Sequence, residues 1–206
     1  MTVVSHEYKF IFVKTGKTAG TAIEVELSKI GGPDDVFTKV FPPVEGHKPR
    51  NSSGFGPFMS AIQIRNNIGQ ERFSNYFKFA VERSPIDKCL SQYGMKINSP
   101  DHNSKTANLS WGEYIKKGNF PVDAKLYTKD GNIIIDRILK YENLENDLSQ
   151  VFSELGVPWT GLKIRPKSGF RFGIPSINEV LPKHRKVIRS AFRDSLRFTP
   201  YYLGDF

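Results

Sequence analysis

Short runs of apolar residues alternate with longer segments that mix polar and apolar positions. The first run, residues 10–13, is followed by a loop of Lys, Gly and Thr and then by a segment that can wind as a helix. An unbroken apolar run is typical of a parallel strand covered on both faces. Further strands are predicted at residues 77–83 and 133–144. This order predicts an α/β fold with a mainly parallel central sheet of four or five strands flanked by helices.

Helices are predicted between and after these strands, at residues 59–73, 86–95, 111–117, 145–155 and 177–198. Pro85 suits the first turn of the second helix, because its missing N–H is not needed there. Residues 31–57 are rich in Gly, Pro and Ser, which indicates a long irregular excursion with one short strand near residues 36–41. Residues 159–175 form a basic, irregular tail. We find no repeat or long linker and expect a single domain over residues 1–206.

The net charge of the chain indicates which kinds of molecule it can bind. Thirty Lys and Arg against 21 Asp and Glu leave a formal charge of +9, which favours an anionic ligand, polymer or surface. The single Cys89 excludes an internal disulfide and indicates a reducing compartment, and we expect no structural metal. No apolar window is long enough to span a bilayer. We expect a cytoplasmic protein that binds no nucleic acid, because no known RNA or DNA motif occurs.

The loop after the first strand has the composition of an anion site. Gly16, Lys17 and Thr18 spell the end of a Walker A motif, but the required first glycine is replaced by Ile11 within the strand. A standard ATP or GTP loop is therefore not expected. The helix that follows places unpaired N–H groups and partial positive charge at its start, and Lys17 adds a full charge. Thr18 or Thr21 is expected to cap this helix. The alternative is an ordinary turn that contains a lysine.

Three segments resemble the sulfotransferase family that includes carbohydrate and heparan-type O-sulfotransferases. KTGKTAGTAIE resembles the family's PKTAGTS segment, YFKFAVERSPIDKCLSQYG its FAFVRNPYDRLVSAY stretch, and ILKYENLENDLSQVFSELG its RYENLEEDF stretch followed by LG. The three motifs occur in the family's order and span most of the chain. Departures from the family pattern are Gly16 for Pro, Glu82 for an apolar residue, Ser84 for Asn and Lys140 for Arg.

The resemblance implies a P-loop-like fold that binds 3′-phosphoadenosine 5′-phosphosulfate (PAPS) and releases adenosine 3′,5′-bisphosphate. Lys17 would contact the oxygen between sulfur and phosphorus and stabilise the leaving phosphate. The rest of the first loop would surround the phosphosulfate: Gly16, Thr18, Ala19, Gly20 and Thr21. The resemblance assigns the 3′-phosphate to Arg83 and Ser91, with Lys167, Ser168 and Arg171 closing over it.

Each of these later residues also has a structural interpretation. Arg83 could form a surface ion pair at the strand end, and Ser91 could be a small residue that packs on the sheet. Lys167 and Arg171 could belong to a solvated basic run.

The remaining catalytic group is a base for the acceptor. By position in the family pattern this is His47, with a surface loop histidine as the alternative and His102, Glu24 and Glu26 in reserve. The acceptor carries a hydroxyl or amine, and a saccharide suits Lys48, Arg50 and Lys105. Trp111, Tyr114 and Tyr127 could stack on a sugar, although aromatics at helical spacing more often form core. The rival interpretations are a nucleotide-dependent kinase and a non-enzymatic polyanion-binding module.

Overall fold

The computed structural model describes residues 2–102, 104–166 and 169–206. The chain divides into two compact units. Unit 1 comprises Met1–Glu82 and Ala124–Pro166, and unit 2 comprises Arg83–Asp123 and Lys167–Phe206. The single domain expected from the sequence stays a prediction.

Unit 1 contains a five-stranded sheet with the order β3-β1-β2-β4-β7. Strands β2 (Phe10–Phe12), β4 (Phe77–Glu82) and β7 (Arg137–Lys140) pair in parallel, as the sequence predicts. Strand β1 (Val3–Ser5) pairs antiparallel with both β2 and β3 (Val36–Phe37). The sheet is therefore mixed, and the prediction of a mainly parallel sheet was wrong. Residues 6–9 are too few for the crossover that a parallel β1–β2 pair would need.

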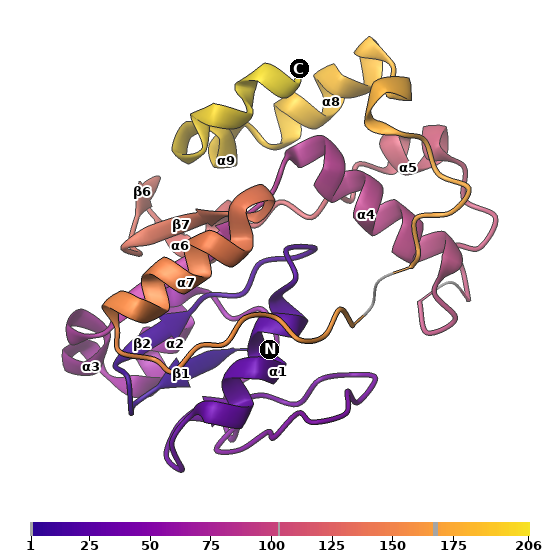
Figure 1. Ribbon diagram of the computed structural model, residues 1–206. Coiled ribbons are helices and arrows are strands. Elements are labelled where there is room, and N and C mark those ends of the chain that lie inside the picture. The colour runs from indigo at the N-terminus through magenta and orange to yellow at the C-terminus, as the bar shows by residue number, and fades with distance from the viewer. Residues whose placement is uncertain (1, 103, 167–168) are drawn as a thin grey trace. The chain divides into compact units, whose positions relative to one another are not determined.

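Helices cover both faces of this sheet (Figure 1). On one face, Phe10 and Phe79 pack in a core cluster with Ile23 of α1 (Gly20–Ile30) and Phe152 of α7 (Leu144–Glu154). The opposite face includes Glu82, which accepts a hydrogen bond of 2.9 Å from Tyr127 in α6 (Ala124–Tyr127). The α/β class with a helix-flanked sheet is thus confirmed.

The remaining elements of unit 1 refine the predicted boundaries. The helix expected at residues 59–73 is two helices, α2 (Ala61–Ile68) and α3 (Gln70–Asn75), because Gly69 between them has φ of 87°. A capping box between Ser60 and Gln63 starts α2. The third predicted strand is shorter than expected, because β7 begins only at Arg137. The first predicted residue, Ile133, belongs to a separate hairpin, whose elements are β5 (Thr128–Lys129) and β6 (Asn132–Ile133). A 3₁₀ turn, η1 (Tyr141–Asn143), joins β7 to α7.

Unit 2 is built on α4 (Pro85–Asn98), which begins at the proline as predicted. Its apolar face packs with α5 (Trp111–Lys117), α8 (Pro182–Ala191) and α9 (Arg193–Phe198) in a second core cluster. The predicted closing helix at 177–198 is therefore divided, with 3₁₀ turns before and after it: η2 (Ile177–Glu179) and η3 (Pro200–Asp205). The stretch between α7 and η2 lacks helix or strand wherever it is described, in line with the irregular tail expected.

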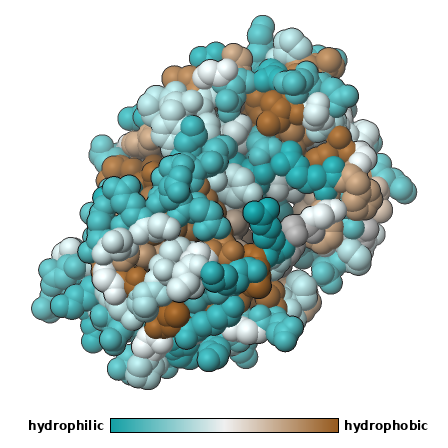
Figure 2. All heavy atoms as spheres, viewed as in Figure 1, coloured by the Kyte–Doolittle hydropathy of each residue, from teal (hydrophilic) through white to brown (hydrophobic). Residues whose placement is uncertain are grey.

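The face of the protein shown in Figure 2 is mostly polar. In Figure 2, hydrophilic residues cover most of the visible face and hydrophobic residues form separate patches. None of the helices within the described ranges is both long and apolar enough to cross a membrane.

A buried carboxylate, Asp35, joins the β1–β2 turn to the end of α1. It is fully buried and accepts hydrogen bonds from Ser5 Oγ at 2.9 Å, His6 N at 2.7 Å, Glu7 N at 3.0 Å and Gly32 N at 3.0 Å. Three of these donors are backbone N–H groups, which would otherwise lose their only partners in the folded chain.

We predict that Asp35→Ala lowers the free energy of unfolding by about 3 kcal/mol, because several donors lose a charged acceptor together. Urea unfolding measures this loss. The control is Asp34→Ala, which removes the same charge from the exposed neighbouring position and is expected to change stability by under about 0.5 kcal/mol. Equal losses in the two variants would contradict the role given to Asp35.

Candidate functional site

The loop between β2 and α1 has a backbone suited to holding an anion. Lys17 has φ of 62° and Ala19 has φ of 59°, both in the left-handed region that side chains other than Gly rarely adopt. Backbone N–H groups around such residues form a concave donor surface. Ala19 is the N-cap of α1 and no side chain caps the helix. The positive end of the helix dipole is therefore available for a ligand.

A buried ion pair beneath this loop fixes its shape. Lys14, at the end of β2, is 4% exposed, and its Nζ lies 3.5 Å from Glu24 Oε2 and donates to Thr21 Oγ1 at 3.1 Å. The Lys14 stem crosses Gly20 so closely that a Cβ there would lie 2.6 Å from Lys14 Cε. Sequence analysis missed Lys14. A lysine that ends an apolar strand was the available signal.

The hydroxyls of Thr18, in the loop, and of Thr21, in the first turn of α1, point into the fold. Thr18 Oγ1 donates to Thr15 O at 3.1 Å, and Thr21 Oγ1 accepts from Lys14. The prediction that Thr18 or Thr21 caps α1 was wrong, because these internal bonds use both side chains. Thr15 Oγ1 also donates to Val81 O, which ties the loop to the neighbouring strand β4. Thr18 and Thr21 can therefore bind a ligand through their backbone N–H groups rather than through their hydroxyls.

His47, the predicted base, lies against the later part of α1. Its Nε2 donates to Thr38 O at 2.9 Å, and its Nδ1 lies 3.2 Å from Ser28 Oγ. Ser28 is eight residues beyond Gly20, which places it about 12 Å along the helix axis from the loop. Thr38 Oγ1 in turn donates to Glu24 at 3.0 Å. His47 is thus linked to the first turn through a chain of side chains rather than by direct contact.

Arg50 holds the same excursion against the end of α1. Its guanidinium donates to the carbonyl oxygens of Ser28 at 3.0 Å, Gly31 at 2.7 Å and Gly32 at 2.9 Å. These carbonyls end the helix, where positive charge is favourable. The structure therefore gives Arg50 a helix-capping role, whereas Lys48 is exposed.

The second turn, within unit 2, brings together two residues predicted for the 3′-phosphate. Arg83 Nε donates to Asp87 Oδ2 at 2.6 Å, and Arg171 donates to Asp87 Oδ1 at 2.5 Å. Burial alone would raise the pKa of Asp87, but the hydrogen bonds and charges of Arg171 and Arg83 outweigh it and lower that pKa. Asn98 also holds the tail, donating to Phe170 O at 2.9 Å. Sequence analysis missed Asp87, although its i,i+4 spacing from Arg83 was a signal.

Among the described residues of unit 2, the other candidate site residues do not join Arg83 and Arg171 at Asp87. Ser91 is half-buried on α4, two turns from Arg83, and Lys167 and Ser168 lie outside the described residues. His102 is half-buried and Lys105 is exposed in the loop after α4. Trp111 and Tyr114 stack on one another at 5.2 Å, with Tyr93 beside them, so these aromatics form core.

The remaining candidates make contacts within the fold. Tyr127, in unit 1, is fully buried, and Glu26 is buried and pairs with Lys29 at 2.9 Å. Burial raises the pKa of the Cys89 thiol to about 12.

The acidic residues that a metal-dependent kinase could use have other partners. Asp136, at the amino end of β7, lies 3.1 Å from Lys78 Nζ, and Asp87 bonds the two arginines. Over the described ranges, no group of three or more His, Cys, Asp or Glu side chains is placed to hold a metal ion. The expectation of a metal-free protein stays a prediction.

We predict that Lys14→Met lowers the free energy of unfolding by about 3 kcal/mol at pH 8, because Glu24 is left buried without its cation. Burial already raises the pKa of Glu24, and Lys14 is the main opposing influence. Without Lys14 the pKa of Glu24 rises further. Stability is then retained below the ordinary glutamate pKa and lost as pH rises through the raised value. Urea unfolding at pH 5 and pH 8 measures this difference.

Two further variants make the measurement specific. Lys14→Met/Glu24→Gln should recover most of the loss and remove its pH dependence, because no charge remains buried. Lys29→Met breaks the more exposed pair with Glu26 on the same helix, and a loss of under about 1 kcal/mol is expected. A pH-independent loss in Lys14→Met would show that Glu24 is not the group responsible.

Comparison with known proteins gives one relationship. The chain is 36% identical over 109 residues to an uncharacterized protein of Archaeoglobus fulgidus, and the match covers 48% of this chain and 84% of the relative. No protein-family model matches the chain, and no solved structure matches it. The chain therefore belongs to the same family as this uncharacterized archaeal protein.

Proposed function

We propose that the protein is a PAPS-dependent sulfotransferase that transfers a sulfuryl group to a hydroxyl or amine acceptor. The observation that carries the proposal is the first turn, where α1 begins without a side-chain cap just after Lys17 and Ala19, both in the left-handed region. A terminal sulfate or phosphate suits such backbone donors, whereas a triphosphate needs the longer Walker loop. This β2–loop–α1 unit is also the basis for proposing a P-loop-like architecture.

In this proposal the first turn binds the phosphosulfate end of the cofactor. PAPS would supply the sulfuryl group for transfer. Lys17 would neutralise charge that gathers on the leaving phosphate, and the backbone N–H groups of residues 18–21 would hold the anion in position. Lys14 is a positioning residue, because it is buried and fixes the start of α1 through Thr21 and Glu24.

The 3′-phosphate is assigned to the arginine pair of unit 2. Arg83 and Arg171 both donate to the Asp87 carboxylate, Arg83 to Oδ2 and Arg171 to Oδ1, so their guanidinium groups are held beside one anion. A guanidinium has five N–H donors, and Asp87 uses only part of them. We assign the 3′-phosphate to this pair, with the more exposed Arg171 supplying donors that Asp87 does not use. Ser91, Lys167 and Ser168 complete this site by resemblance alone.

The proposal also needs a general base that accepts the proton of the acceptor. His47 is the candidate by resemblance, and in the structure both its ring nitrogens face groups of the fold, Thr38 O and Ser28 Oγ. Ser28 already donates its own proton to Val25 O at 2.7 Å, which leaves its oxygen able to accept. For direct transfer the excursion that carries His47 would have to approach the loop, because Ser28 lies well along α1 from Gly20. Glu24 and His102 remain the alternatives.

We predict that adenosine 3′,5′-bisphosphate stabilises the protein in a thermal-shift titration. At 100 times its dissociation constant, a ligand that binds only the folded state adds about 2.7 kcal/mol, or about 5–10 °C in a chain of this size. Lys17→Ala should reduce the affinity for the bisphosphate at least about tenfold while the unliganded melting temperature stays unchanged. Lys129→Ala, which removes an equal charge from an exposed strand, is the control.

The rival functions give other outcomes in the same titration. Stabilisation by ATP with magnesium, and none by the bisphosphate, would replace the proposal with a kinase. Stabilisation by heparin alone, lost steeply with salt, would replace it with a polyanion-binding module. A cytoplasmic location and a saccharide acceptor belong to the same proposal. Both depend on stabilisation of the protein by adenosine 3′,5′-bisphosphate.

We predict that His47→Gln lowers the free energy of unfolding by about 1–2 kcal/mol, because two hydrogen bonds that hold the excursion on α1 are lost. A base role predicts in addition that turnover falls at least about 100-fold while affinity for the bisphosphate is kept. Stability and turnover are measured on the same variant with an acceptor found by screening. Near-normal turnover would exclude His47 as the base and direct the test to Glu24 and His102.

A further inference from the structure

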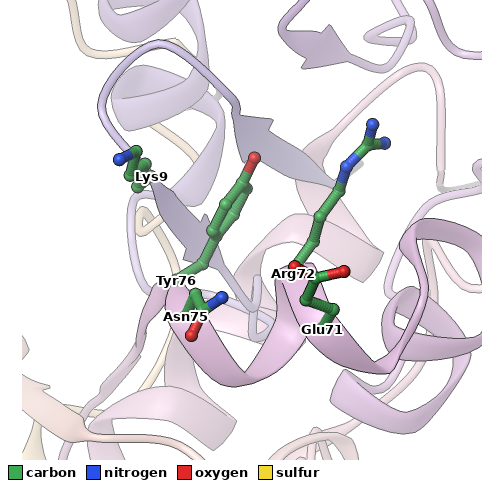
Figure 3. Close-up of a pocket in the computed structure, with 5 residues that line it drawn as sticks. All are labelled: Lys9, Glu71, Arg72, Asn75 and Tyr76. Atoms are coloured by element: carbon green, nitrogen blue, oxygen red, sulfur yellow. The ribbon is translucent and has the colours of Figure 1, made fainter.

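A hollow in unit 1 lies at the amino ends of the parallel strands, opposite the end that carries the first turn. It has a volume of about 330 Å³ and is lined by Lys9, Glu71, Arg72, Asn75 and Tyr76 (Figure 3). Lys9 immediately precedes β2 and Tyr76 immediately precedes β4, and Lys9 O accepts a hydrogen bond of 2.9 Å from Phe77 N. The hollow is thus built on the sheet itself, and neither proposed anion site contributes to it.

Two cations of this hollow have no anionic partner. Within the described part of the chain, neither Lys9 nor Arg72 forms an ion pair. Figure 3 shows the Arg72 guanidinium and the Tyr76 hydroxyl extended in the same direction, whereas the Glu71 carboxyl stays close to the helix. Glu71 therefore offsets part of the charge of the hollow but does not pair with Arg72. An ammonium, a guanidinium fork, an amide and a phenol together offer more donors than acceptors.

His6 forms a hydrogen bond with Tyr76, one of the residues that line the hollow. His6 Nδ1 lies 2.7 Å from the Tyr76 hydroxyl, and the two rings meet edge to face at 5.6 Å. When His6 is neutral at Nδ1, Tyr76 donates its proton to the histidine. When His6 is protonated there, the histidine donates instead and the Tyr76 proton is free to turn elsewhere. Protonation of His6 at Nδ1 therefore decides whether the Tyr76 hydroxyl can donate to the hollow.

We propose that this hollow is a binding site for a small tetrahedral oxyanion, a sulfate or phosphate group, held by Lys9, Arg72 and the Tyr76 hydroxyl. Arg72 supplies the planar fork that suits such a group, and Lys9, on the other side of Tyr76 in Figure 3, adds a second charge to the lining. The volume exceeds that of the bare ion, so the group can belong to a free ion or to an ester of a small polyol.

Binding at this site is linked to the protonation of His6. Burial lowers the pKa of His6, Arg72 lowers it further, and Asp35 and Asp34 oppose this. An anion on Arg72 neutralises that second influence and raises the pKa of His6. By linkage, the anion binds more tightly below this pKa than above it, since both proton and anion favour the same state. Tyr76, whose own pKa is raised by burial, stays protonated throughout.

The experiment is an NMR pH titration of the His6 ring in the full chain, with sodium sulfate compared against sodium chloride at equal ionic strength. Sulfate does not itself titrate in this range. We expect sulfate to tighten proton binding at His6 by about fivefold, the lower end of couplings between neighbouring sites. Lys9→Gln should weaken this response. Arg72→Gln should raise the pKa of His6 without sulfate and abolish the response. Lys129→Gln, an equal charge change outside the hollow, should keep it.

The outcomes decide the proposal and the source of the anion. A response to inorganic sulfate alone identifies a free ion, and a stronger response to glucose 6-sulfate identifies an ester. Equal responses to sulfate and chloride, or a response that survives in Arg72→Gln, would overturn the site. Lys17→Ala is expected to leave the His6 titration unchanged, so this result is independent of the sulfotransferase proposal.

Discussion

The buried pair of Lys14 and Glu24 is the interaction on which the rest of unit 1 depends. It joins the end of β2 to α1, and the Lys14 stem leaves room only for Gly at position 20. Burying two charges away from water costs free energy unless the two remain paired with each other. The loop above them must therefore close in one way, through left-handed residues that leave α1 without a side-chain cap. The anion-binding character of the loop is a consequence of this closure.

The C-terminal end of helix α1 is held by charged side chains from the segment that follows it. Arg50 bonds the carbonyls at its end, and Asp35 bonds Gly32 just beyond it and the β1–β2 turn. Thr38 and His47 connect the excursion between α1 and α2 to Glu24 and Ser28. Residues with the chemistry of a ligand site thus serve the fold. This explains how a long segment without regular structure keeps a defined position.

The cationic side chains that matter in this protein lie at strand ends or pair with carboxylates. Lys17 follows the carboxyl end of β2, and Lys9 and Arg72 lie at the amino ends of β2 and β4. In unit 2, Arg83 and Arg171 converge on Asp87. A net charge of +9 alone describes none of this. Local geometry decides which cations already have a carboxylate and which present donors to solvent.

The sequence by itself determined the α/β class, the β2–loop–α1 unit, and the start of α4 at Pro85, because apolar runs, proline and loop composition act locally. Only the tertiary structure decided that β1 makes the sheet mixed, that Lys14 rather than a threonine fixes the helix start, and that Asp87 joins Arg83 to Arg171. It also decided that His47 and Arg50 pack on the later part of α1. These results depend on which residues meet across the fold, and no local pattern specifies that, because burial and pairing are properties of contacts between distant segments.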